Sequence, residues 1–243
     1  KMLTSESIPL ASFRLVLASS PEEDLSFSTL DEFLALEVPF SICNVAAGVG
    51  KKTKGTLEKL GKWGAFESAK KTTSPRVTDA AAAIKASDAV QAGFIWDTTA
   101  RQFGLKIHEL AELQKVRSRI SVNVTSSSAK PAQALLFARY LASAQKGQTH
   151  FSKHHFSSVT GDEWEKSPEL TVYCGGLNRD AVYQTLRDFE KREGCTVETA
   201  WMGCGLLVSK MKGGETPDVY HTCDASFHTM VEDRFRQLTN ISQ

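Results

Sequence analysis

Three cysteines, Cys174, Cys204 and Cys223, follow runs of residues that are typical of β-strands. Each lies within three residues of the end of such a run. Parallel strands deliver their next loops to one edge of a sheet, so we expect the three thiols to lie close together. The N-terminus of a helix favours the thiolate form of a cysteine. Three converging thiolates would suit a soft cation such as copper(I) or zinc.

The same thiols also have a simpler interpretation. Cysteine is a small residue that fits tight loops, and its S–H group is a weak hydrogen-bond donor. The chain holds five cysteines without close spacing, which is not the pattern of a disulfide framework, although one disulfide remains open. Cys204 with His221 or His228 could form a thiol–imidazole pair, but no enzyme signature accompanies it. We therefore expect no catalysis.

Glycine turns offer a second chemistry, the binding of an anion by backbone N–H groups. Three such turns join a strand-like run to a helix-like run: Gly48-Val49-Gly50, Gly175-Gly176-Leu177 and Gly203-Cys204-Gly205. Free N–H groups and the positive end of a helix dipole make such turns anion sites without lysine or arginine. Glycine also lets a backbone approach a ligand closely. None of the turns completes a G-x-G-x-x-G fingerprint or a P-loop, so nucleotide binding lacks its motif.

Strand-like and helix-like runs alternate along the chain. The strand-like runs are 13–18, 38–43, 92–96, 120–124, 170–173, 197–201 and 218–220. Helix-like runs lie between most of them, for example at 79–85 and 131–145. This alternation predicts an α/β fold with mostly parallel sheets and helices on both faces. Ligands of such sheets bind beyond the carboxyl ends of the strands, where the glycine turns and cysteines lie.

Composition limits the classes of function. The chain has 243 residues, of which 41% are hydrophobic and 23% charged, as in an ordinary globular protein. A net charge of +1 argues against a nucleic-acid binder, which usually carries a clear basic excess. No apolar run approaches the ~20 residues that span a bilayer. The first residues also lack the apolar segment of a signal peptide.

Residues 171–231 resemble the first half of the molybdate-type periplasmic substrate-binding proteins. The segments that carry the resemblance are, in order, TVYCGG (171–176), FEKREG (189–194), GCGLLV (203–208) and GGETPDVY (213–220) with Cys223 and Asp224 following. The first 156 residues resemble the second half of the same family. That resemblance rests on RLVL (14–17), LEKLGKW (57–63), AGFIWD (92–97) and the helix-like region 137–156.

The resemblance implies a type 2 periplasmic binding fold, in which a hinge joins two α/β lobes. Its halves stand in reversed order, so we expect a circularly permuted domain or a piece of a tandem array. The expected division is a second-half-like lobe at 13–120, a return segment and helix at 121–156, a linker at 157–169 and a first-half-like lobe at 170–243. Exchange of halves between two chains is the alternative arrangement.

The resemblance also implies a function: a non-catalytic solute-binding protein of the periplasm or another extracytoplasmic space, without a cofactor. Its lobes would close over a small oxyanion such as molybdate or tungstate and pass it to an ABC transporter. The implied ligand contacts are the three glycine turns together with Asp79, Trp96 and Cys223. Cys204 replaces a serine and Trp96 a tyrosine that are common in the family, which leaves mainly backbone donors.

Two alternative functions remain on the same fold. One is a soft-metal binder or redox sensor lined by Cys174, Cys204 and Cys223. The other is an interaction domain of a tandem protein that no longer binds a solute. Fold alone does not choose among these functions, because function depends on the site.

Overall fold

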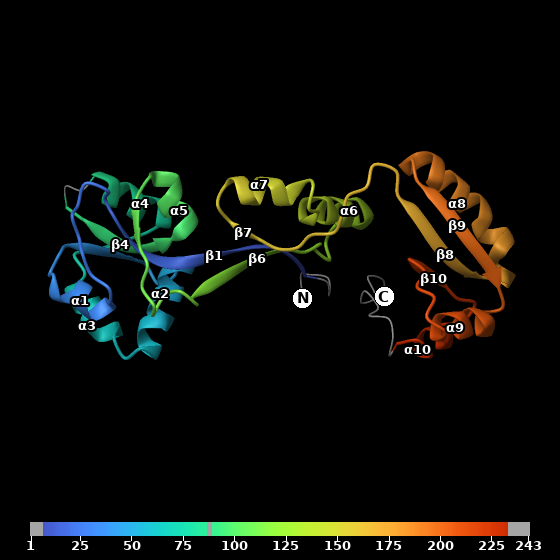
Figure 1. Ribbon diagram of the computed structural model, residues 1–243, viewed down its shortest axis with the longest axis horizontal. Helices are drawn as coiled ribbons and strands as arrows, with labels where there is room; N and C mark the ends of the chain where they lie inside the picture. The colour runs from blue at the N-terminus through green and yellow to red at the C-terminus, as the bar shows by residue number, and fades with distance from the viewer. Residues whose placement is uncertain (1–6, 87–88, 233–243) are drawn as a thin grey trace. The chain divides into compact units, whose positions relative to one another are not determined.

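The computed structural model describes residues 7–86 and 89–232 and shows two compact units (Figure 1). The first unit comprises Ser7–Asp162, and the second begins at Glu163. The point of division lies within 157–169, the expected linker, while residues 233–243 of the expected second lobe fall outside the described residues. In the described part of the chain, no helix is both long and apolar enough to cross a membrane.

The first unit is built on a seven-stranded sheet. Its elements are, in order, β1 (Ile8–Ser19), α1 (Leu30–Ala35), β2 (Phe40–Cys43), α2 (Gly48–Lys59), α3 (Trp63–Ala69), β3 (Thr72–Ser74), α4 (Val77–Ala86), β4 (Ala92–Trp96), α5 (Asp97–Phe103), β5 (Lys106–His108), β6 (Arg117–Val122), α6 (Pro131–Ala142), α7 (Gly147–Lys153) and β7 (Ser157–Ser158). The strand order is β3-β2-β4-β1-β5, and β6 and β7 also pair with β1.

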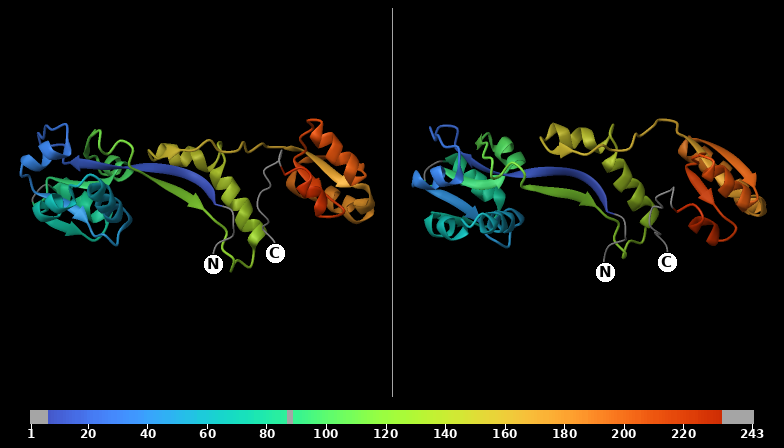
Figure 2. Two further views of the ribbon diagram at one scale, coloured as in Figure 1. Left: turned by 90° about the horizontal axis from the view of Figure 1, so that it is seen from below. Right: turned by 60° about the horizontal axis from the view of Figure 1, so that its bottom comes forward.

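The long strand β1 runs through the whole first unit (Figure 2). Its residues 15–19 pair with β4 and β5, and its residues 8–14 pair with β6 and β7. All four pairings are antiparallel, whereas β2 pairs in parallel with β3 and β4. The strands other than β1 therefore run in one direction. The predicted α/β fold is confirmed. The sheet of this unit is mixed rather than mostly parallel, because the opposing strand β1 makes four antiparallel pairings.

Two hydrophobic clusters of the first unit lie along β1. The larger cluster surrounds residues 15–18 and contains four phenylalanines, one each from α1, β2, α3 and β4, whose rings stack or meet edge to face. The smaller cluster joins Ile8 and Leu10 of β1 to Ala138 and Ala142 of α6. Because β1 contributes to both clusters, it holds the two ends of the unit together.

The second unit is a three-stranded parallel sheet with helices on both faces. Its elements are β8 (Glu169–Gly175), the 3₁₀ turn η1 (Gly176–Asn178), α8 (Arg179–Glu193), β9 (Thr196–Met202), α9 (Cys204–Lys212), β10 (Val219–His221) and α10 (Ser226–Thr229). The strand order is β10-β8-β9. Successive residues of a strand point to opposite faces. Val172 accordingly packs on the side of α8, and Tyr173 packs against residues of α9.

A buried hydrogen bond joins β1 to β5 in the first unit. Ser19 Oγ lies 2.9 Å from His108 Nε2, both side chains are buried, and Phe27 stacks on the imidazole ring. Burial, with a smaller contribution from the charge of Lys106, lowers the pKa of His108 below its usual value of 6.5. The folded unit therefore holds a neutral imidazole in mild acid, where the unfolded chain would protonate it.

We predict that the first unit loses stability as the pH falls through about 6.5 toward the lowered pKa of His108. In that range the unfolded chain binds a proton that the folded unit does not, so acid favours unfolding. Urea denaturation at about pH 7.5 and about pH 5.5 measures this loss as a lower free energy of unfolding. The His108→Gln variant should be less stable at both pH values but should show a smaller difference between them. An unchanged difference would contradict this role of His108.

Candidate functional site

The N-terminus of α2 presents backbone N–H groups that no side chain caps. Asn44, which follows β2, shapes the turn: its side-chain and carbonyl oxygens accept N–H hydrogen bonds of 2.8 Å from the residues two and three positions on. Ala47 is the N-cap residue, has an extended backbone and provides no capping side chain. The helix then opens on the predicted anion contacts Gly48, Val49 and Gly50. Uncapped N–H groups at a helix start carry a partial positive charge.

The two glycines of this turn have different surroundings. Gly50 is buried, and a Cβ at this position would collide with the carbonyl oxygens of Cys43 and Asn44. Gly48 is exposed, and a Cβ there would meet nothing within 4 Å. Gly50 thus permits α2 to approach the end of β2, while Gly48 lies at the position that a solute can reach.

Asp79 lies at the same edge of the sheet, in the first turn of α4. Its side chain is exposed, and its charge acts on the thiol of Cys43 at the end of β2. Burial, with a smaller contribution from Asp79, raises the pKa of Cys43 to about 11. Cys43 is therefore a neutral thiol near pH 7. The negative charge of Asp79 opposes an anion at short range, and its role as a ligand contact stays a prediction.

Trp96, the aromatic residue predicted to contact a ligand, ends β4 and is the N-cap residue of α5. Its ring is half-buried and meets the ring of Phe13 on β1 edge to face, with centroids 4.5 Å apart. Part of the indole is thus used in packing β4 against β1. Its contact with a ligand stays a prediction.

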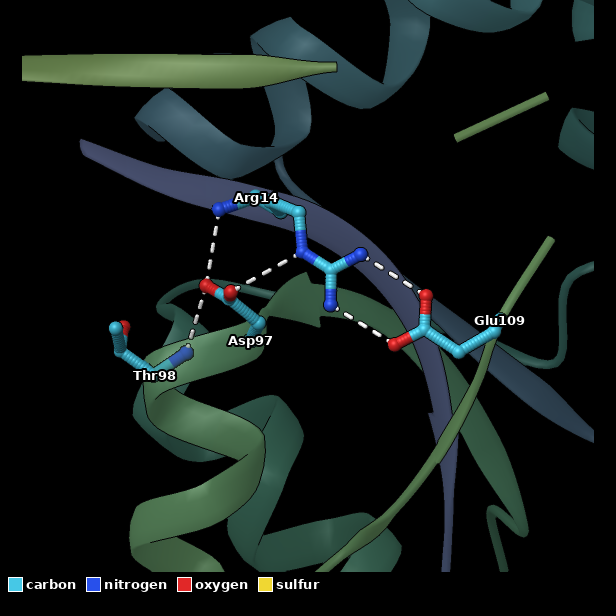
Figure 3. Close-up of polar contacts among 4 residues, drawn as sticks. All are labelled: Arg14, Asp97, Thr98 and Glu109. Atoms are coloured by element: carbon cyan, nitrogen blue, oxygen red, sulfur yellow. Dashed lines mark hydrogen bonds and ion pairs between the residues drawn. The ribbon is translucent and has the colours of Figure 1, made fainter. Parts of the chain in front are cut away.

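Asp97, which the sequence alone does not single out, is buried next to Trp96 and joins the start of α5 to β1 (Figure 3). One carboxylate oxygen accepts hydrogen bonds of 2.9 Å from the backbone N–H groups of Arg14 and Thr98, and the other accepts one of 3.4 Å from Arg14 Nε. The Arg14 guanidinium also forms a bidentate pair with Glu109, with both N–O distances at 2.9 Å. This hydrogen-bonded pair lowers the pKa of Glu109 and raises that of Arg14.

A basic groove of about 1050 Å³ lies beside α2 and the start of β6. Its charged lining residues are five basic and one acidic: Lys52, Lys59, Lys115, Arg117 and Arg119, and Glu112. Lys52 follows Gly48 by one helical turn, about 6 Å along the axis, so the groove begins close to the α2 N-terminus. Lys52, Thr56 and Lys59 recur at i, i+4 and i+7, which is the signal by which the sequence could have revealed this surface.

In the second unit, Cys204 and Cys223 are in contact. Cys204 is the first residue of α9, and Cys223 follows β10. Their Sγ atoms are 2.7 Å apart, and the Cys223 N–H donates a hydrogen bond of 3.2 Å to Cys204 Sγ. Gly175 provides the necessary room, because a Cβ there would lie 2.5 Å from Cys223 Sγ and 2.9 Å from Cys204 Sγ.

Cys174 does not complete a three-thiolate site with this pair. It is fully buried in the cluster on the α8 side of β8, and its Sγ lies 3.4 Å from Nδ1 of His221. Among the described residues, no three His, Cys, Asp or Glu side chains are placed to hold a metal ion. The alternative metal site of Cys174, Cys204 and Cys223 is therefore not formed, because the Cys174 side chain points to the face of β8 opposite α9.

The other predicted contacts of the second unit lie at the carboxyl ends of its strands. Gly176 and Leu177 form η1 after β8, and the Leu177 side chain is 87% exposed. Gly203 is the N-cap residue of α9, without a capping side chain, and Gly205 lies in the first turn. Parallel strands bring these turns to one edge of the sheet. Their roles as ligand contacts stay predictions.

Residues 1–157 of the 243 match the family model of the bacterial extracellular solute-binding proteins. The chain belongs to this family. The matched region contains nearly the whole first unit, with the α2 N-terminus, the basic groove and the Asp97 contacts. No curated protein matches this solute-binding protein in sequence.

Solved structures show a similar fold. The substrate binding domain assigned to a molybdenum ABC transporter of Clostridium difficile is 22% identical, with a TM-score of 0.53 over 65% of this chain and 69% of that chain. A two-component system protein that mediates signal transduction is 13% identical, with a TM-score of 0.55 over 65% of this chain and 58% of that chain. The periplasmic molybdate-binding protein of Azotobacter vinelandii is 19% identical, with a TM-score of 0.49 over 65% of this chain and 71% of that chain. The solute-binding protein thus spans 69% and 58% of the first two structures, and they show its fold alone.

We predict that Asp97→Ala lowers the free energy of unfolding of the first unit by about 2–4 kcal/mol, because it leaves the Arg14 and Thr98 N–H groups without an acceptor. Asp97→Asn should lower it less, because its amide oxygen can still accept from both N–H groups. Glu109→Gln, at an exposed carboxylate, should change it by less than about 1 kcal/mol. Urea denaturation of the three variants gives the order, and equal losses for Ala and Asn would show that the acceptor does not matter.

Proposed function

We propose that this solute-binding protein binds a small tetrahedral oxyanion of the molybdate or tungstate kind and catalyses no reaction. The observation that carries the proposal is the N-terminus of α2, where the first-turn N–H groups have no side-chain cap and Gly48 is exposed. Backbone N–H groups at a helix start bind anions without a charged side chain. Hydrogen bonds to a charged oxygen are about twice as strong as those between neutral groups.

The charge of the neighbouring surface supports an anionic solute. The basic groove that begins one turn from Gly48 holds five basic residues and one acidic residue. A concave surface of one sign raises the local concentration of ions of the opposite sign and speeds their association. The groove would attract the oxyanion, and the uncapped N–H groups would hold it. The negative charge of Asp79 would repel the oxyanion from the start of α4.

We further propose that the solute is passed to the membrane component of an ABC transporter on the outer side of the cytoplasmic membrane. Support comes from the extracellular family and from the similar domain that is assigned to a molybdenum ABC transporter. The reversed order of the two halves, and the closure of two lobes over the solute, are proposed on the sequence resemblance. In that proposal, Gly175–Leu177 and Gly203–Gly205 add backbone donors in the second unit.

A pair of substitutions at Gly48 tests the backbone donors. Gly48→Pro deletes one N–H group, while the proline ring suits the first position of a helix and the extended Ala47 can precede it. Gly48→Ala keeps the N–H group, and its Cβ enters open space. We predict that Gly48→Pro weakens molybdate binding about tenfold or more, as expected for the loss of one hydrogen bond to a charged group. Gly48→Ala should change the affinity only slightly.

Isothermal titration calorimetry with molybdate, tungstate and sulfate measures these affinities, and far-ultraviolet circular dichroism checks that both variants are folded. Equal affinities of the two folded variants would contradict the role of the α2 N-terminus. Heat released with zinc chloride, and none with any oxyanion, would overturn the proposed class of solute.

A second pair of substitutions tests the basic groove. Lys52 lines the groove, whereas its neighbour Lys51 does not. We predict that Lys52→Ala weakens molybdate binding about two- to fivefold at low salt, and that Lys51→Ala has a smaller effect. The difference should shrink when sodium chloride is raised above about 0.1 M, where the Debye length falls below about 10 Å. Calorimetry at two salt concentrations checks this, and equal effects of the two variants would count against the groove.

A further inference from the structure

Cys204 and Cys223 lie with their sulfur atoms in contact, 2.7 Å apart. A shift of less than about 1 Å would bring them to the ~2.04 Å of a disulfide bond. Cys204 is buried at the start of α9, and Cys223 is exposed in the segment after β10. We propose that these two residues form a reversible intramolecular disulfide by exchange with a small disulfide in the surroundings.

The surroundings of the pair favour this bond over the alternatives. Gly175 lies against both sulfurs and has no side chain to separate them. Cys174 is fully buried beside His221, and Cys195 is half-buried in the cluster on the α8 side. Cys174 is near enough for electrostatic interaction with Cys204 and Cys223, but among the described residues the sulfur–sulfur contact is that between Cys204 and Cys223. The bond would therefore form between Cys204 and Cys223 rather than with another cysteine of the unit.

The exchange proceeds in two balanced steps. The thiolate of Cys223, the exposed partner, attacks one sulfur of a disulfide RSSR, forms a mixed disulfide and releases one RS⁻. The thiolate of Cys204 then attacks the Cys223 sulfur, forms the Cys204–Cys223 bond and releases the second RS⁻. The two cysteine protons pass through solvent to the two RS⁻ ions. The protein loses two electrons and two protons, and RSSR is reduced to two RSH.

The compartment and the local structure fit such a bond. Proteins of an extracellular family meet an oxidising environment, in which disulfides persist. The hydrogen bond with Cys204 is the main cause that raises the pKa of Cys223, so the fraction of reactive thiolate, and with it the exchange rate, grows with pH. Once formed, the disulfide would tie the Gly203–Gly205 turn to the segment after β10 and hold both at one edge of the sheet.

The test uses the full chain, freed of reductant and incubated with oxidised glutathione. We expect the mass of the intact chain to fall by that of two hydrogen atoms. Peptide mapping without reduction should detect the peptides of Cys204 and Cys223 linked to each other. Dithiothreitol should reverse both changes. The oxidised chain should show a melting transition higher by about 5 °C or more, because the bond closes a loop of about twenty residues. The reaction should be faster at about pH 9 than at about pH 7.

Three variants complete the test. Cys204→Ser and Cys223→Ser should each prevent the loss of two hydrogens, and Cys223→Ser should also slow the first step, the attack of a protein thiolate on oxidised glutathione. Cys195→Ser is the matched control and should form the bond as the unchanged chain does; circular dichroism confirms that each variant is folded. The proposal is overturned if the chain ends only as glutathione adducts, or if the joined peptides contain Cys174 or Cys195. It is also overturned if the chain stays fully reduced at both pH values.

Discussion

The buried carboxylate of Asp97 occupies a gap between two strands that pair with the same side of β1. On that side, β4 ends where Trp96 pairs with Leu15, and β7 begins where Ser157 pairs with Ser12. The Arg14 N–H lies between them and donates to Asp97 instead of to a strand. A buried N–H group without an acceptor is costly. The continuity of β1, and with it the joining of both hydrophobic clusters, therefore depends on this carboxylate.

In both units a helix begins at the carboxyl end of a parallel strand, but the groups at the helix start differ in their chemistry. In the first unit a helix begins on glycines with bare backbone donors, and basic side chains lie one turn further along. In the second unit a helix begins on Cys204, whose sulfur meets that of Cys223. The first arrangement suits an anion and the second suits thiol chemistry. Both follow from parallel strands, which direct their loops and the starts of their helices to one edge.

The sequence predicts the elements of this fold better than the contacts between them. The strand-like run 92–96 coincides with β4, and the run 13–18 finds only the part of β1 that lies in the larger cluster. Residues 15–18 of the larger cluster are apolar on both faces, whereas residues 8–12 pair only with β6 and β7, and Pro9 and Ser12 interrupt their apolar pattern. The role of Asp97 could not be predicted, because the gap that it fills depends on where two distant strands end. The prediction that Cys174 shares a metal site with Cys204 and Cys223 was wrong. A shift of one residue along a strand reverses the face to which a side chain points, and the Cys174 side chain lies on the face of β8 away from the pair.

The pairing of β1 also has a consequence for the order in which the first unit can assemble. The partners of β1 lie far along the chain, from Ala92 of β4 to Ser158 of β7. Contacts between residues so distant in sequence must close long loops, which makes folding slow. During synthesis on the ribosome, the backbone N–H and C=O groups of β1 would lack their strand partners until β4 and β6 have been synthesised. Exposed strand edges of this kind can pair with other chains. A chaperone that covers β1 during synthesis would therefore reduce aggregation of this unit.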